Sequence, residues 1–138
     1  MISAIVAVVI VAFIVALVIA VARDPGPPPE DVAVAYEQAW DRLDFEALWT
    51  LSGDELHDGL RRREYVDAKR AAYAMQPELG GLAEAVHVEH VESGRHVAVV
   101  RTCIQLRGGG TAHNEIQLES RGGRWVVVGY LLRSDPTG

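Results

Sequence analysis

The chain has 138 residues, of which 13 are basic and 19 are acidic, so its formal net charge is −6 at neutral pH. This acidic balance argues against a nucleic-acid partner, because binding to a phosphate backbone requires a basic surface. The single cysteine, Cys103, excludes a disulfide within the chain. The length outside the apolar N-terminus is enough for one domain with its own hydrophobic core.

The N-terminal segment is uncharged up to Arg23, and every residue from Ala4 to Ala22 is apolar. A helix of this length covers roughly 28 Å, close to the thickness of the hydrocarbon core of a bilayer. The run predicts a transmembrane helix over residues 1–22. We therefore expect a single-pass protein of the cell membrane, with the lipid bilayer as a partner and with the side of the soluble domain left open. A cleaved signal peptide stays open as the alternative, because Ala20-Val21-Ala22 has the small-x-small form of a cleavage site.

Residues 23–29 are rich in proline and predict an extended spacer between this segment and a domain over residues 30–138. From Glu30 the pattern becomes helical, and Asp44 is a predicted N-cap for a short helix over residues 45–51. A third helix is expected over residues 62–75, ahead of Pro77. The apolar stripe of the first of these helices consists of Val32, Tyr36, Ala39, Trp40 and Leu43.

After Leu82 the apolar residues alternate, which is typical of strands. Four strands are predicted, over residues 85–92, 95–106, 111–120 and 124–133. The short glycine-containing connections between them require an antiparallel meander. A change of parity predicts a bulge near Val99-Val100. The sequence therefore predicts an α+β domain in which three helices pack on a curved antiparallel sheet of four or more strands.

Two segments carry a resemblance to a known family. Tyr36-x3-Trp40-x2-Leu43-Asp44-Phe45-x2-Leu48-Trp49 lies in the helical half, and Gly123-Arg124-Trp125-Val126-Val127-Val128-Gly129-Tyr130 closes the sheet. The chain resembles the NTF2-like superfamily over residues 30–133, and this resemblance implies a cone of helices against a curved sheet, as in SnoaL and ketosteroid isomerase. The superfamily holds isomerases, dehydratases and non-catalytic domains, so the fold does not choose a function.

Catalytic members resembling ketosteroid isomerase or scytalone dehydratase use an inward carboxylate, or an Asp-His pair, with a tyrosine donor. The inward strand positions of this chain offer only Thr102 and Asn114, and neither is a base near neutral pH. We therefore predict no catalytic residue. A small-molecule pocket between helices and sheet, with or without isomerase-like or dehydratase-like chemistry, is the alternative function. Its predicted lining residues are Tyr36, Trp40, Tyr73, Thr102, Asn114 and Tyr130.

The last strand is apolar on both faces, whereas one helical layer covers only one face of a sheet. By parity, the outer face carries Trp125, Val127 and Leu131. We expect these three residues to contact a second copy of the chain or another protein. The leading interpretation is thus a membrane-tethered, non-catalytic binding or assembly module that forms a homodimer.

No metal site and no cofactor are predicted. His87, His90 and His96 are separated by odd or long steps, and strand residues three apart point to opposite faces. Cys103 is expected on the outer face, with no histidine beside it on that strand face, and is interpreted as inert.

Overall fold

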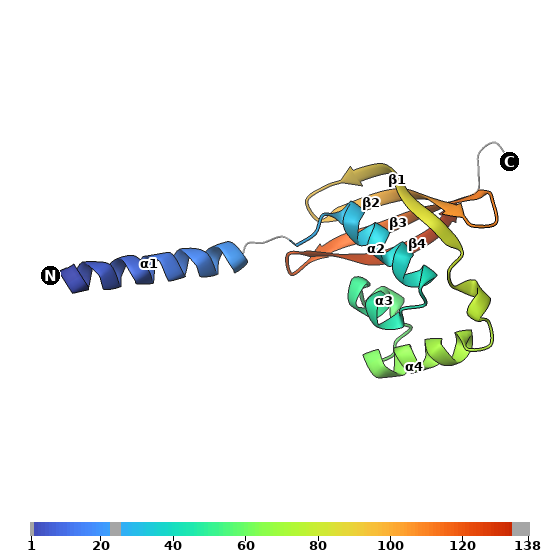
Figure 1. Ribbon diagram of the computed structural model, residues 1–138, viewed down its shortest axis with the longest axis horizontal. Helices are drawn as coiled ribbons and strands as arrows, with labels where there is room; N and C mark the ends of the chain where they lie inside the picture. Colours follow the sequence, from blue (N-terminus) through green and yellow to red (C-terminus); the bar gives the residue numbers. More distant parts are fainter. Residues whose placement is uncertain (1, 23–25, 134–138) are drawn as a thin grey trace.

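The computed structural model describes residues 2–22 and 26–133, and within the first of these segments it describes the side chains of residues 3–16 (Figure 1). Helices occupy the N-terminal half of the chain and strands the C-terminal half. In chain order the elements, with η for a 3-10 helix, are α1 (Ile2–Ala22), α2 (Pro29–Asp41), α3 (Phe45–Leu51), η1 (Asp54–Leu56), α4 (Arg62–Tyr73), η2 (Pro77–Leu79), β1 (Ala83–Ser93), β2 (Val97–Leu106), β3 (Thr111–Arg121) and β4 (Arg124–Arg133).

Helix α1 contains the apolar N-terminal run. Within the described part of the chain, no helix is both long enough and apolar enough to cross a membrane. This finding contradicts the predicted transmembrane helix over residues 1–22. The side chains of Ala20-Val21-Ala22, and residues 23–25 of the predicted spacer, lie outside the described residues.

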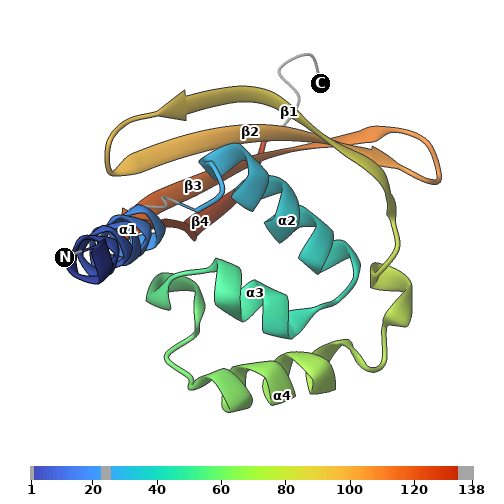
Figure 2. The ribbon, with the colours of Figure 1, turned by 60° about the vertical axis from the view of Figure 1, so that its left-hand side comes forward.

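The four strands form one antiparallel sheet in the order β1-β2-β3-β4. Helices α2, α3 and α4 all lie on its concave side (Figure 2). The α+β class and the four-stranded meander predicted from the sequence are therefore confirmed. The glycine-containing turns explain the topology, since connections this short can join only antiparallel neighbours.

Three bulges interrupt the strands, and the first makes Glu84 an extra residue at the beginning of β1. In β1 the register with β2 shifts between Val88 and His90, so Glu89 is an extra residue. In β4 the register with β3 shifts so that Val128 is the extra residue between Val127 and Gly129. The bulge predicted at Val99-Val100 is wrong, because these residues pair regularly with β3. The parity change in the sequence reflects an apolar residue on the outer face and not an extra residue.

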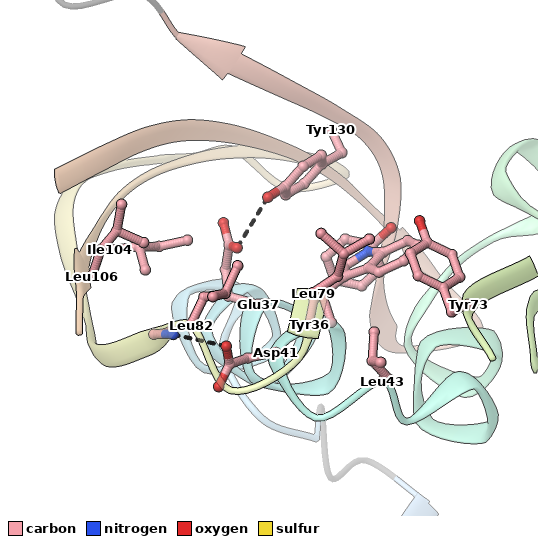
Figure 3. A pocket seen from close by; sticks show the side chains of 12 residues that line it. Tyr36, Glu37, Asp41, Leu43, Tyr73, Leu79, Leu82, Ile104, Leu106 and Tyr130 are labelled. Carbon is pink, nitrogen blue, oxygen red and sulfur yellow. Dashed lines mark hydrogen bonds between the residues drawn. The ribbon is translucent and has the colours of Figure 1, made fainter. Parts of the chain in front are cut away.

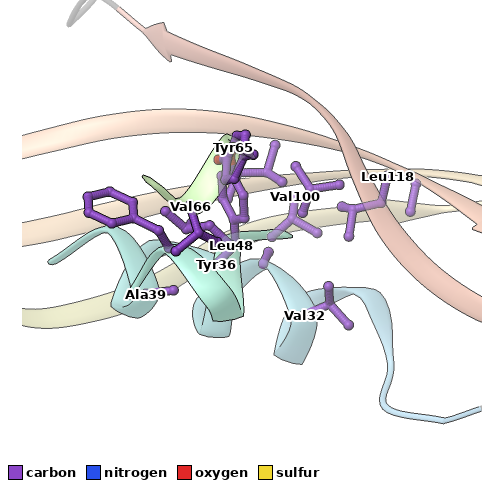
Figure 4. Close-up of a cluster of buried hydrophobic side chains, with 13 residues drawn as sticks. Val32, Tyr36, Ala39, Leu48, Tyr65, Val66, Val100 and Leu118 are labelled. Atoms are coloured by element: carbon purple, nitrogen blue, oxygen red, sulfur yellow. The ribbon is translucent and has the colours of Figure 1, made fainter. Parts of the chain in front are cut away.

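The hydrophobic core fills the space between the helices and the concave face of the sheet (Figure 4). Helices α2 and α3 present apolar stripes to the sheet, and α4 packs its stripe against α3, as the 3.6-residue period allows. Asp44 caps α3, because its side chain accepts a hydrogen bond from the Ala47 N–H at 3.1 Å, and this confirms the predicted cap. The fully buried apolar side chains include Leu48, Val66, Val100, Ile116, Leu118 and Val127.

Candidate functional site

A cavity of about 470 Å³ lies between α2, the segment from Tyr73 to Ala83 and the concave face of the sheet (Figure 3). Its wall is mainly apolar and aromatic. The aliphatic part of the wall comes from the loops and from β2, namely Leu43, Leu79, Leu82, Ile104 and Leu106. A space of this size and character is typical of sites that bind small molecules.

The carboxylate of Glu37 is the central polar group of this cavity. Glu37 lies on α2 and is only 3% exposed. Its Oε1 accepts hydrogen bonds from Thr102 Oγ1 at 2.9 Å and from Asn114 Nδ2 at 3.0 Å. Its Oε2 accepts a hydrogen bond from the Tyr130 hydroxyl at 3.1 Å, drawn as a dashed line in Figure 3. A single carboxylate thus joins α2 to three strands.

Strand register brings the three donors together. Thr102 and Asn114 are direct cross-strand partners on the concave face of β2 and β3. Tyr130 reaches the same face because the extra residue Val128 resets the alternation of side chains in β4. Asn114 also donates to the Tyr130 hydroxyl at 2.8 Å. Glu37, Thr102, Asn114 and Tyr130 therefore form one hydrogen-bonded cluster, although they are far apart in the chain.

Burial sets the acidity of this group. Removal from water raises the pKa of Glu37 above its ordinary value of 4.5, and the hydrogen bonds from Asn114, Thr102 and Tyr130 oppose that rise only in part. Burial, followed by the charge of Glu37, also raises the pKa of Tyr130. Glu37 therefore keeps its proton to a higher pH than an exposed glutamate does. A titratable group with a shifted pKa in a cavity is a candidate functional residue.

Asn114 carries an unsatisfied acceptor. Its Nδ2 donates to both Glu37 and Tyr130, whereas its Oδ1 is buried and has no hydrogen-bond partner among the residues that the structure describes. A buried acceptor of this kind costs free energy unless a water molecule or a ligand donates to it. The cluster of Glu37, Thr102, Asn114 and Tyr130 therefore lacks one hydrogen-bond donor, the one that would satisfy Asn114 Oδ1.

Asp41 lies one helical turn after Glu37 and also borders the cavity. Its Oδ1 accepts a hydrogen bond from the Ala83 N–H at 2.8 Å, which joins the end of α2 to the beginning of β1. This carboxylate is already committed to the backbone, so we assign it a role in positioning the rim of the cavity.

The structure places four of the six predicted pocket residues in the wall of the cavity. Tyr36, Trp40, Tyr73 and Tyr130 line the cavity. The rings of Tyr36 and Tyr130 are 5.6 Å apart, and those of Trp40 and Tyr73 are 5.9 Å apart. The other two, Thr102 and Asn114, do not line it; they are buried on the strands and donate hydrogen bonds to Glu37.

Glu37 itself was not predicted, because it lies one residue after Tyr36, outside the apolar stripe. A signal was nevertheless present in the sequence. Thr102 and Asn114 face inward, and buried polar side chains require hydrogen-bond partners. The packed helix had to supply such a partner, and Glu37, four residues after the fully buried Ala33, stands on the right face.

The three predicted interface residues do not lie on one surface. Val127 is completely buried in the core, and Trp125 packs against that core. Leu131 is 52% exposed and pairs with Glu115 on the convex face. The extra residue Val128 reverses the alternation of side chains in β4, so Trp125 and Val127 face the core whereas Leu131 faces outward.

Comparisons with known proteins identify the fold. No family model and no curated protein matches the sequence. A Campylobacter jejuni protein whose name calls it an NTF2-like transpeptidase has a similar crystal structure, with a TM-score of 0.56 and 14% identity over 73% of this chain and 97% of that one. A SEC-C motif containing protein from Rhodopseudomonas palustris matches with a TM-score of 0.54 and 19% identity over 77% of this chain and 79% of that one. At these identities the likeness concerns structure alone, and it shows that the chain has an NTF2-like fold.

Proposed function

We propose that this domain binds a small, mostly apolar molecule in the cavity between α2 and the sheet, and that a polar group of the ligand contacts Glu37 and Tyr130. The observation that carries the proposal is a buried carboxylate set into an apolar wall. Buried charges are costly, and a role confined to stability would be served as well by apolar packing. A ligand that donates a hydrogen bond gives the carboxylate and the unsatisfied Asn114 Oδ1 a purpose.

The wall and the polar group have separate roles in this proposal. The aliphatic and aromatic side chains supply affinity, because each square ångström of apolar surface removed from water contributes about 25 cal/mol. Asn114 supplies selectivity, because a ligand without a donor leaves its Oδ1 unpaired. We expect the ligand to have an apolar body and one hydroxyl or amine.

Binding is favoured over catalysis by the way Glu37 is occupied. Three donors already contact its two oxygens, and these hydrogen bonds lower its pKa, so the carboxylate is a weaker base than its burial alone would make it. Proton transfer between Glu37, Tyr130 and a ligand is the second candidate function, supported by the raised pKa of the carboxyl.

The homodimer remains a prediction. The residues expected to form its interface are divided between the core and the convex face, so these three residues do not form one apolar surface for a second copy. Binding in the cavity requires no second copy.

The test is fluorescence titration of the full chain with N-phenyl-1-naphthylamine, a neutral apolar probe. In Leu82→Trp a larger side chain replaces a half-exposed residue of the cavity wall. We expect at least tenfold weaker binding than in wild type. Leu131→Trp makes the same change on the convex face and should bind the probe as wild type does. Any binding of the probe to other apolar surfaces is the same in both variants and cancels in the comparison. Equal affinities of the two variants would overturn the proposal.

A further inference from the structure

The convex face of the sheet carries a row of metal-ligating side chains that is remote from the cavity. His87 of β1 pairs with Cys103 of β2, and Cys103 pairs with His113 of β3. Directly paired residues of antiparallel strands project from the same face with their Cβ atoms about 5 Å apart. Cys103 therefore has a histidine on each side, and the prediction that none lies beside it on this face is wrong.

Glu89 completes this group. As the extra residue of the second bulge in β1, it turns its carboxylate toward β3, and its Oε1 lies 2.9 Å from His113 Nδ1. One potential ligand atom from each of Glu89, Cys103 and His113 lies within 4.8 Å of the others. Three adjacent strands thus direct an oxygen, a sulfur and a nitrogen ligand to one point on the surface.

We propose that Glu89, Cys103 and His113 bind a zinc ion on the convex face of the sheet, with His87 as the fourth ligand. Zinc accepts carboxylate, thiolate and imidazole together, and it prefers four ligands in a tetrahedron. Tetrahedral zinc places its ligand atoms about 3.5 Å apart, so small rotations suffice for Glu89, Cys103 and His113. His87 lies outside this close group, and its ring has to turn toward Cys103, its cross-strand partner, in order to coordinate. All four residues are exposed or half-buried, and an ion reaches them from solvent.

Arg133 orients the carboxylate ligand. Its Nη2 contacts Glu89 Oε2 at 2.7 Å, which leaves Oε1 directed toward His113. Hydrogen bonding of the oxygen that is not coordinated is typical of the groups that surround metal ligands. The ion pairs of Glu89 with Arg133 and His113 hold these three residues together without a metal. The Cys103 thiol is hydrogen-bonded to Glu89 in the same group, and burial together with the Glu89 carboxylate raises the pKa of this thiol, so zinc has to displace a thiol proton that is held in place.

Binding changes the protonation of two ligands. The Cys103 Sγ–H bond breaks as the bond from sulfur to zinc forms, and the proton passes to the buffer. His113 coordinates through Nδ1 in its neutral form and so gives up any proton on that atom. Zinc itself is neither oxidised nor reduced. Affinity should consequently fall as the pH is lowered.

The experiment is a titration of the full, tag-free chain under reducing conditions with Zn²⁺ in competition with a chromophoric indicator, followed by Co²⁺ as a spectroscopic probe. We expect wild type to show a thiolate-to-cobalt charge-transfer band that Zn²⁺ abolishes. Cys103→Ser should lose the band, and His113→Ala should weaken Zn²⁺ binding at least 100-fold.

His90→Ala is the matched control. His90 lies on the same face of β1, but its ring contacts Glu92 at 3.1 Å, outside the proposed site, so this variant should bind like wild type. Circular dichroism confirms that each variant is folded. Zn²⁺ binding of wild type that is no tighter than that of folded Cys103→Ser would overturn the proposal. Glu37→Gln, on the other side of the sheet, should leave Zn²⁺ affinity unchanged, so this result is independent of ligand binding in the cavity.

Discussion

The Tyr130 hydroxyl lies 3.1 Å from the Glu37 carboxylate, although the two residues are 93 positions apart in the chain. This contact joins the first helix of the domain to the last strand. Together with Thr102 and Asn114 it turns an apolar cavity into one with a single, buried and titratable polar group. The stability and the binding properties of the domain therefore depend on the same carboxylate.

Glu37→Gln should change how stability depends on pH. The folded-state pKa of Glu37 is raised above 4.5, so the folded protein binds the proton more tightly than the unfolded chain does. The stability associated with this group is complete below pH 4.5 and is lost as the pH rises through the folded-state pKa. We expect urea midpoints of wild type to fall relative to those of the Glu37→Gln variant across that range. If the urea midpoints of the two proteins changed in parallel with pH, the raised folded-state pKa of Glu37 would be contradicted.

Asn114→Asp should destabilise the domain strongly at pH 7. The change removes two donors and places a second carboxylate beside Glu37, and we expect a cost of at least about 2 kcal/mol. Both carboxyl groups then have raised pKa values in the folded state, so the loss should shrink as the pH is lowered through those raised values toward the ordinary pKa of a carboxyl group, about 4. Asn114→Ala removes the same donors without adding a charge. Urea unfolding at several pH values should show the strong recovery at low pH for the aspartate variant alone.

Leu48→Ala should cost about 3 kcal/mol of unfolding free energy. Leu48 is completely buried between α3 and the sheet (Figure 4), and truncation of such a side chain leaves a cavity in a packed core. Leu131→Ala is the control, because Leu131 is half-exposed on the convex face and should change stability by less than about 0.5 kcal/mol. Similar urea midpoints for the two variants would place the core elsewhere.

Asp44→Ala should lower stability by about 1 kcal/mol, since it removes the side-chain acceptor for the Ala47 N–H at the beginning of α3. Asp44→Ser keeps an acceptor at this position and should retain most of the stability. Thermal unfolding followed by circular dichroism measures both. A serine variant as unstable as the alanine variant would show that the carboxylate acts in another way.

Local patterns in the sequence were enough to predict the architecture. The change of period near Leu82 separates the helices from the strands, and turns at Gly94, Gly109 and Gly122 fix an antiparallel order. The predicted strand ends lie within a few residues of those observed, and the helix over residues 45–51 is placed correctly by its cap. Each of these signals depends only on neighbours in the chain.

The candidate sites depend on contacts that local patterns do not contain. Glu37 was missed because its partners Thr102 and Asn114 come from strands more than sixty residues away. The histidines beside Cys103 were missed because register between strands is set by packing and bulges. The apolar N-terminal run predicted a membrane-spanning helix by length and composition, and among the described residues the structure shows none.

The extra residue at Val128 affects how related sequences should be aligned. Without the bulge, strict alternation after Val127 would direct Tyr130 away from Glu37. A homologue one residue shorter at this point would have a regular strand and would still present its tyrosine to the carboxylate. An ungapped alignment of the two would place that hydroxyl in the wrong column. A search for proteins that share this chemistry must therefore permit a one-residue gap between Val127 and Gly129.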